Sequence, residues 1–148
     1  MIDLSGRIIL AERGTSSKSK TYETPMKFHL ATAVGKNQFT GYGDGYVAVN
    51  NQRLEHAVVV TPNTLHEDWH ASTFDALDAA HLRYVLALKP EILVLGTGAT
   101  QRFPRAELMR EFALAQVGVE IMTTPAACRT YNILMAEGRA VAAAILLA

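Results

Sequence analysis

The chain has 148 residues, of which 49 % are apolar and 19 % are charged, and this length can bury a core without disulfides or a structural metal. Its 14 lysines and arginines balance its 14 aspartates and glutamates, which excludes the basic footprint of a protein that binds nucleic acid or anionic membranes. The single cysteine, Cys128, excludes a disulfide within the chain and fits a reducing compartment.

The amino terminus, Met1–Arg7, has neither the basic segment nor the long apolar segment of a signal peptide. The longest apolar run, residues 140–148, is far shorter than the roughly 20 residues that a membrane-spanning helix needs. These features predict a single domain, residues 1–148, located in the cytoplasm, without membrane insertion and without nucleic acid as a partner.

The N-terminal part of the chain is expected to begin with a short strand and a polar loop. Residues 7–11 are mostly apolar and typical of a strand, whereas residues 13–20 are small, polar and basic. A phosphate-binding loop is an alternative interpretation of residues 13–20, but the segment lacks the Gly-Lys-Ser/Thr ending of a P-loop. A solvated loop is therefore the favoured interpretation.

Residues 28–60 are typical of strands that are interrupted by turns. Three glycines within residues 41–45 permit backbone conformations with positive φ. Residues 46–49 and 54–60 flank Asn50–Arg53, where asparagine tolerates the left-handed conformation that a hairpin turn needs. We therefore expect an antiparallel layer, and because its last four residues are continuously apolar, we expect its last strand to be buried on both faces.

The second half of the chain alternates apolar runs with segments of helical spacing. The predicted elements are a helix from a cap at Asp78 to Lys89-Pro90, a strand at 92–95, a helix from Pro104 to Gly118, a strand at 119–122, a helix from a cap at Thr124 to Glu137 with Gly138 behind it, and a strand at 140–147. Crossovers of this length predict parallel strands with right-handed connections. The fold class is therefore α/β: a three-layer single domain with a central, mostly parallel sheet, helices, and an antiparallel β-hairpin layer from the N-terminal half.

Two loops of the second half are predicted to share one rim of the sheet. Gly96-Thr97-Gly98 and Thr123-Thr124 each follow a strand, and the carboxyl ends of parallel strands point the same way. Glycines let a ligand approach the backbone, a helix N-terminus favours an anion, and Arg102 and Arg129 could supply charge. Alternatively, the two glycines only permit a tight turn, and the third glycine of a dinucleotide fingerprint is replaced by Gln101.

The helix predicted at 125–137 contains further candidate residues. Cys128 lies near its fourth position, where the helix dipole lowers a thiol pKa, but no histidine or carboxylate stands nearby in sequence to activate it. Tyr131 and Met135 follow at core spacing, so packing is favoured over a nucleophile for Cys128. Arg129 and Asn132 either form an exposed ridge or satisfy neighbouring backbone groups.

The segment His66-Glu67-Asp68-Trp69-His70 matches the His-Glu-x-x-His motif of zinc proteases. That motif requires both imidazoles on one helical face, yet the segment lacks amphipathic helical support. Its extended form also fails, because position 73 is threonine and position 76 is alanine. We therefore interpret it as a chance match and predict no metal site and no cofactor.

Several strings of residues carry a resemblance to a known family. They are Gly96–Gly98, Gly118–Glu120, Met122–Thr124, Ala126–Asn132, Glu137–Arg139 with Val141–Ala144 and, more loosely, Gly41–Gly43, Tyr46–Asn50 and Trp69. Through them the chain closely resembles domain of unknown function family 498, which includes a mitochondrial assembly factor for respiratory complex I. Thr123 departs from the aspartate expected there, which weakens any acid–base role at that position. The resemblance implies a compact three-layer α/β fold and an assembly or interaction role.

The leading hypothesis is a non-enzymatic interaction or assembly-type protein with another protein as its partner. The alternative is a small-molecule or anion-binding enzyme that uses the Gly96-Thr97-Gly98 loop and the N-terminus of helix 125–137. Both hypotheses use one candidate surface, which consists of Gly96, Thr97, Gly98, Thr123, Thr124, Cys128, Arg129 and Asn132.

Overall fold

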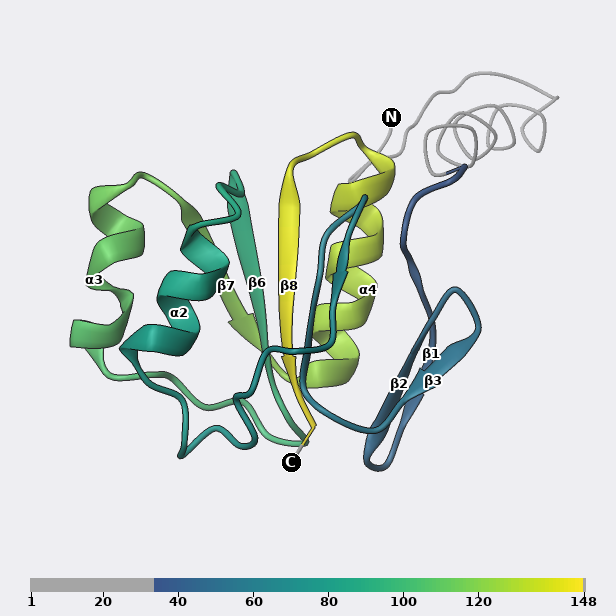
Figure 1. The fold of residues 1–148 in the computed structure, drawn as a ribbon, viewed down its shortest axis with the longest axis horizontal. Coiled ribbons are helices and arrows are strands. Elements are labelled where there is room, and N and C mark those ends of the chain that lie inside the picture. Colours follow the sequence, from purple (N-terminus) through teal and green to yellow (C-terminus); the bar gives the residue numbers. More distant parts are fainter. Residues whose placement is uncertain (1–33, 148) are drawn as a thin grey trace, which may run out of the picture. The chain divides into compact units, whose positions relative to one another are not determined.

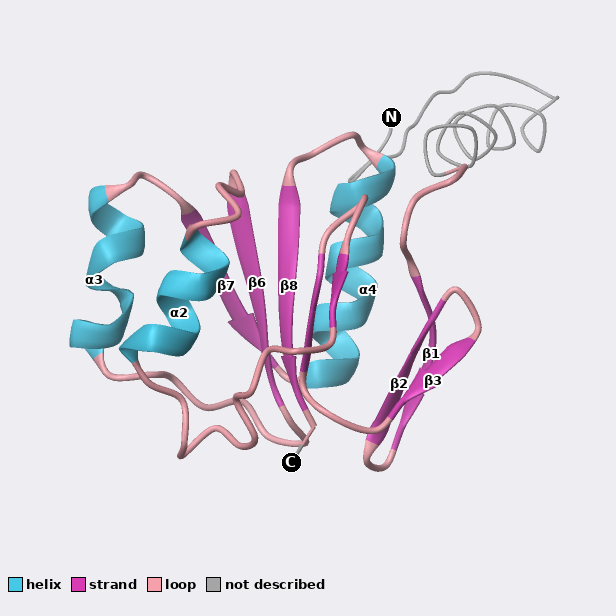
Figure 2. Cartoon of the chain, viewed as in Figure 1, coloured by secondary structure: helices cyan, strands magenta, loops and turns pink. Residues whose placement is uncertain are grey.

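A computed structural model describes residues 34–147 of the chain, and the account below concerns the unit that begins at Gly35. The strand predicted at 7–11, the loop at 13–20 and the start of the strand-like region at Phe28 lie outside the described residues. The described elements are drawn in Figures 1 and 2.

Eight strands and three helices make up the described part of the chain. The strands are β1 (Phe39–Gly43), β2 (Tyr46–Val49), β3 (Gln52–Leu54), β4 (Val58–Val60), β5 (Leu65–His66), β6 (Ile92–Thr97), β7 (Gly118–Met122) and β8 (Val141–Leu146). The helices are α2 (Ala79–Leu86), α3 (Ala106–Leu114) and α4 (Thr124–Ala136).

The central sheet has five strands in the order β5-β4-β8-β6-β7. Strand β6 is parallel to both of its neighbours, β7 and β8, as the crossover lengths predict. Strand β4 runs antiparallel to β8 and forms an antiparallel hairpin with β5. Helices α2 and α3 cover one face of this sheet and α4 covers the other (Figure 1), which confirms the predicted α/β layers.

Alternating residues of β6 and β8 supply the two sides of the core. Leu93 and Leu95 of β6, with Ala142 and Ala144 of β8, are buried in the cluster that includes α2 and α3. The intervening residues of the same strands face α4. All three residues of β4 are buried, so the prediction that the strand ending at Val60 is buried on both faces is confirmed. All six residues of β8 are buried as well.

A separate three-stranded antiparallel sheet, β1-β2-β3, packs beside α4 (Figure 2). Its β2–β3 turn has Asn50 and Asn51 with φ of 50° and 70°, the left-handed conformation that hairpin turns of this kind need. The predicted antiparallel layer is thereby confirmed. The strand expected over residues 54–60 is wrong, however, because the chain changes sheets there: Leu54 pairs with β2, whereas Val58 pairs with β8.

The helix ends agree with the sequence at some positions and correct it at others. The Asp78 carboxylate accepts a hydrogen bond from His81 N at 3.1 Å, so the predicted cap of α2 is confirmed. Helix α3 begins at Ala106 rather than Pro104, because Arg105 has extended backbone angles (φ −60°, ψ 146°). At the end of α4, Gly138 has φ +81° and donates to Met135 O, which confirms its predicted position behind the helix.

The N-cap predicted for α4 is displaced by one residue. Thr123 is the N-cap and makes no side-chain capping bond, and Thr124 is the first helical residue with Pro125 behind it. Both threonines precede a proline by one or two positions and are compatible with a helix start. The structure differs from the prediction because the Thr124 hydroxyl does not cap its own helix. It forms hydrogen bonds with backbone groups of Gly98 and Leu146, beside the ends of β6 and β8.

Candidate functional site

The predicted rim lies where β6 and β7 end. The chain leaves β6 toward α3 on one face of the sheet and leaves β7 toward α4 on the other face. Adjacent parallel strands that diverge in this way create a topological switch point, the usual ligand site of an open α/β sheet. The structure therefore brings Gly96, Thr97, Gly98, Thr123 and Thr124 together, as expected from the sequence.

Internal hydrogen bonds occupy the polar groups of Thr124. Its hydroxyl accepts from Gly98 N at 2.9 Å and donates to Leu146 O at 2.5 Å, and its own N–H donates to Gly98 O at 2.9 Å. Thr124 is only 6 % exposed. The Thr124 hydroxyl thus connects the start of α4 to the ends of β6 and β8, and it has no remaining proton to offer a ligand.

The Thr97 hydroxyl closes the loop that follows β6. It donates to Thr100 O at 2.7 Å, lies 3.2 Å from Met122 O, and accepts from Arg102 N at 3.2 Å. The Arg102 guanidinium, which could have supplied charge to the rim, instead pairs with Asp75 at 2.7 Å. The hydrogen-bonding capacity of this part of the rim is therefore used within the protein.

Gly96 permits close packing of α4 on the central sheet. A methyl group at this position would lie 2.9 Å from Thr124 Oγ1 and 3.1 Å from Ala127 Cβ. These distances are too short for any larger side chain, so the glycine lets α4 approach β6 closely. Of the two interpretations of the Gly-Thr-Gly loop, close packing accounts for Gly96, and a turn accounts for Gly98, whose φ is +94°.

Cys128 is buried in the face of α4 that packs on the sheet, with 1 % of its surface exposed. Burial raises the pKa of its thiol to about 12, against the smaller opposing effect of the neighbouring Arg129 charge. Because the nucleophilic form of cysteine is the thiolate, a thiol with this pKa is unreactive at neutral pH. Tyr131 and Met135 are buried on the same face, in agreement with their core spacing.

Asn132 joins α4 to the three-stranded sheet. Its side-chain oxygen accepts from Phe39 N at 2.8 Å, and its side-chain nitrogen donates to Phe39 O at 2.8 Å. The amide therefore pairs with both backbone groups on the free edge of β1, as a neighbouring strand would. Of the two interpretations of Asn132, the structure favours the one in which it satisfies backbone groups, although those groups lie 93 residues away.

Two residues beside Asn132 reinforce this junction. The Tyr131 hydroxyl donates to Asn37 O at 2.9 Å, and its ring meets the Phe39 ring edge to face at 5.3 Å between centroids. Arg129 is exposed and donates to the Tyr42 hydroxyl at 2.7 Å. The string Cys128–Asn132, which carries the family resemblance, thus supplies both buried side chains and contacts to residues 37–42.

The His-Glu-x-x-His segment does not form a helix. His66 belongs to strand β5, and the following residues form a turn. Its imidazole Nδ1 lies 3.0 Å from the Tyr84 hydroxyl, which itself donates to Asp68 Oδ1 at 2.9 Å. No group of three histidine, cysteine, aspartate or glutamate side chains in the described residues is placed to hold a metal ion.

Hydrogen bonds hold the His66 ring on two sides. The Tyr84 hydroxyl donates its single proton to Asp68, so its oxygen accepts from His66 Nδ1. The other ring nitrogen, Nε2, lies 2.8 Å from the Thr64 hydroxyl. Burial and the Asp68 carboxylate raise the pKa of Tyr84 above its ordinary value of 10.0, so the phenol keeps the proton that it donates to Asp68.

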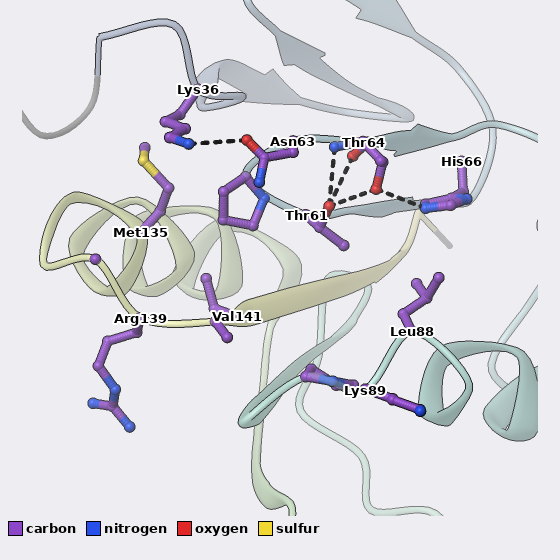
Figure 3. A pocket seen from close by; sticks show the side chains of 14 residues that line it. Lys36, Thr61, Asn63, Thr64, His66, Leu88, Lys89, Met135, Arg139 and Val141 are labelled. Carbon is purple, nitrogen blue, oxygen red and sulfur yellow. Dashed lines mark hydrogen bonds between the residues drawn. The ribbon is translucent and has the colours of Figure 1, made fainter.

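A cavity of about 550 Å³ lies at the opposite end of the sheet, where β6 and β8 begin (Figure 3). Three turns meet there: the β4–β5 turn, the segment between α2 and β6, and the segment between α4 and β8. This cavity was not predicted from the sequence, because its residues come from segments that have no common motif. The signal available in the sequence was the placement of Lys89 three residues before one predicted strand and of Arg139 one residue before another.

No helix in the described part of the chain combines the length and the apolar composition that a membrane crossing requires.

Comparison with known proteins identifies relatives of this chain. It is 30 % identical over 109 residues to the 13 kDa major membrane protein of Francisella tularensis, covering 73 % of this chain and 89 % of that protein. It is 39 % identical over 71 residues to NADH dehydrogenase [ubiquinone] 1 alpha subcomplex assembly factor 3 of Danio rerio. That match covers 48 % of this chain and 41 % of the assembly factor, so this chain accounts for less than half of that protein's length.

The fold also occurs in solved structures. The crystal structure of a Bordetella parapertussis protein superposes with a TM-score of 0.73 at 42 % sequence identity, covering 78 % of this chain and 99 % of that chain. The sequence pattern of one family matches residues 39–146, which contain all eight candidate residues and both sheets. The chain therefore belongs to the family described as Protein of unknown function (DUF498/DUF598), as the resemblance predicted.

Proposed function

We propose that this chain is a non-enzymatic interaction protein of the assembly-factor type, which binds another protein through the exposed side of α4 and the adjoining β1–β2 hairpin. The name of the Danio rerio relative supports an assembly role. The observation that carries the proposal is the use of the Cys128–Asn132 string. Its polar groups hold the three-stranded sheet to α4 rather than surrounding a reaction centre.

The proposed surface is centred on Arg129. This side chain is exposed and holds the Tyr42 ring, which is 38 % exposed, by a hydrogen bond to its hydroxyl. Ile133 lies one helical turn further along α4 and is 57 % exposed. Tyrosine and arginine are enriched among the residues that dominate binding energy in protein interfaces, and an exposed isoleucine supplies apolar area beside them.

The alternative of a small-molecule or anion-binding enzyme at the rim has less support. The hydroxyl groups of Thr97 and Thr124 are paired internally, Cys128 is buried with a raised pKa, and Arg102 is paired with Asp75. A catalytic site needs groups that are free to act on a substrate. Glu120 and His70 are exposed, so neither shares the buried environment of Cys128 in the way that a nucleophile–base pair requires.

The test compares two substitutions of exposed apolar residues. Ile133→Asp changes the proposed surface, whereas Leu114→Asp changes a residue that is 76 % exposed on α3. Both variants should fold, because neither side chain is in the core. We expect wild type and Leu114→Asp to recover the same cross-linked protein partner from cells that make this chain, and Ile133→Asp to lose it. Recovery of that partner by all three proteins would refute the proposed surface.

Asn132→Ala is a poor test of this proposal, since its side chain holds β1 in place. Loss of a partner in that variant would not separate a contact from a displaced hairpin. Ile133 and Leu114 avoid this ambiguity because they have comparable size and exposure on different helices.

A further inference from the structure

Phe103 exposes an aromatic ring beside the carboxyl end of β6. The residue lies in the segment between β6 and α3 and is 68 % exposed, although phenylalanine is among the residues most often buried. In Figure 1 this segment runs near the bottom of the view, as does the segment that leads into α2, and the two segments are joined by the Arg102–Asp75 ion pair. A single exposed apolar side chain is common, but one that adjoins an apolar hollow marks a contact surface.

Such a hollow, of about 250 Å³, lies directly beside the ring. Phe103 forms part of its wall, and the other apolar side chains that line it include Phe74, Leu77 and Leu108. Leu77 is buried in the core cluster, and Phe74 and Leu108 pack against that cluster. The volume is below the roughly 300–1,000 Å³ of a typical small-molecule site, so the hollow suits one side chain of a protein partner. Filling it with an aromatic ring would bury apolar area on both partners.

The loop that carries the ring is held in place by its neighbours. The N–H of Arg102 donates to Thr97 Oγ1 at 3.2 Å, and the Arg102 guanidinium donates to Asp75 at 2.7 Å. The guanidinium carbon also lies 4.3 Å from the centroid of the Phe74 ring. Because the loop is preorganised, docking of Phe103 requires little further ordering of the backbone.

Two groups of opposite charge at the edge of the hollow are able to form further ion pairs. Asp75 lines the hollow and binds Arg102 through Oδ1, while its Oδ2 accepts no hydrogen bond from the other residues that the structure describes. Arg105 also lines the hollow, is exposed, and forms no ion pair within the described part of the chain. A surface that offers one carboxylate and one guanidinium is complementary in charge to a rotated copy of itself.

The ring, the hollow and the two charges form one surface, the Phe103 patch, which consists of Phe74, Asp75, Leu77, Phe103, Arg105 and Leu108. We propose that the Phe103 patch binds a second copy of this chain, with the Phe103 ring of each copy in the hollow of the other. Because ring and hollow adjoin, one two-fold axis forms both contacts at once and brings Arg105 of each copy to Asp75 of the other. The formal net charge of zero adds no overall repulsion between the copies.

The small size of the Phe103 patch determines the expected affinity. It is far smaller than the roughly 20–30 residues that each side of a stable interface contributes. We therefore expect a transient dimer with a dissociation constant between about 10 µM and 1 mM. An anionic membrane fits the patch less well, because the Asp75 carboxylate would face the headgroups. The proposal goes beyond the proposed function, since the Phe103 patch shares no residue with the surface centred on Arg129.

Sedimentation velocity of the full-length chain across that concentration range tests the dimer. Phe103→Ser should raise the dissociation constant about tenfold or more, whereas Leu114→Ser, which changes a residue that is 76 % exposed at the other end of α3, should leave it unchanged. Arg105→Glu should raise it about fivefold, since it places a carboxylate opposite Asp75. Arg110→Glu makes the same charge change at an exposed position on α3 and should have no effect. Equal thermal unfolding of all the variants by circular dichroism would show that each one folds.

An isotope-filtered NOE experiment on a mixture of ¹³C-labelled and unlabelled chains identifies the contact itself. We expect NOEs from the Phe103 ring of the unlabelled copy to the methyl groups of Leu77 and Leu108 in the labelled copy. The same signals should be absent when the unlabelled chain is Phe103→Ser.

Three outcomes would overturn the proposal: a chain that stays monomeric up to about 1 mM, a dimer that Phe103→Ser leaves unchanged, or a dimer without the expected NOEs. Sedimentation with phosphatidylglycerol vesicles separates a second copy from a lipid surface as the occupant. We expect the protein to remain in the supernatant. Sedimentation with the vesicles that Phe103→Ser abolishes would refute the dimer and assign the Phe103 patch to the membrane.

Discussion

Asn132→Ala should detach the three-stranded sheet from α4 while leaving the central sheet folded. The substitution removes two hydrogen bonds of 2.8 Å and leaves the N–H and C=O of Phe39 without their partners. Phe39 is 6 % exposed, so water replaces those partners poorly. The two losses together should destabilise the junction by about 2–3 kcal/mol.

Amide hydrogen exchange measures this effect element by element. A loss of about 2–3 kcal/mol corresponds to an increase of about 30- to 150-fold in the exchange rate of β1 and β2, if that sheet opens as a unit. Exchange in β6 and β8 should change much less, because their hydrogen bonds are made within the central sheet.

Gln101→Ala provides the matched control. Its side-chain amide also donates to a backbone carbonyl, Ile121 O, at 2.9 Å, but at an exposed edge where water can take its place. We expect its effect on stability to be within about 0.5 kcal/mol. If Gln101→Ala destabilises the protein as much as Asn132→Ala, or if exchange in β1 does not change, the assignment of Asn132 as the junction residue is wrong.

Three further substitutions test the interior of the rim and of α4. Thr124→Val should lower the free energy of unfolding in urea by about 2–3 kcal/mol, because it leaves two buried backbone groups unpaired. Thr123→Val should lower it less, since Thr123 makes no side-chain capping bond. Gly96→Ala should cost about 1–3 kcal/mol through its 2.9 Å and 3.1 Å contacts, whereas Gly41→Ala, with 3.7 Å to its nearest neighbour, should be nearly neutral. Burial raises the pKa of the Cys128 thiol from 9.0 to about 12 in the folded chain, so its contribution to stability should be fully present below pH 9 and lost as pH rises toward about 12. Cys128→Ala should lack this part of the alkaline loss of stability. An equal loss of stability in both proteins would contradict the burial of the thiol.

The sequence was sufficient to predict the elements of the second half and their parallel arrangement. Continuous apolar runs mark β6 and β8, and Asp78 and Gly138 mark helix ends by their local chemistry. Such signals depend on residues within one turn of each other, which is why they can be recognised without the structure. The prediction that residues 1–148 form one domain remains untested, because the first 33 residues lie outside the described part.

Errors arose where a residue's partner is distant in sequence. Thr124 was predicted to cap its own helix, but its hydroxyl bonds to Gly98 and Leu146, 26 and 22 residues away. Asn132 reaches Phe39 across 93 residues, and no periodicity encodes that contact. The cavity was missed for the same reason, since it is formed by three turns that meet only in the folded chain.

Helix α4 connects the proposed partner surface to the cavity, and this decides which substitutions can test that surface alone. Its buried face carries Cys128 and Tyr131 and ends at Met135, which lines the cavity, while its exposed face carries Ile133. A change at Cys128 or Tyr131 would shift the whole helix and disturb the partner surface and the cavity together. Ile133→Asp changes the exposed face without entering the core. Loss of the partner in this variant therefore reports on the proposed surface and not on a displaced helix.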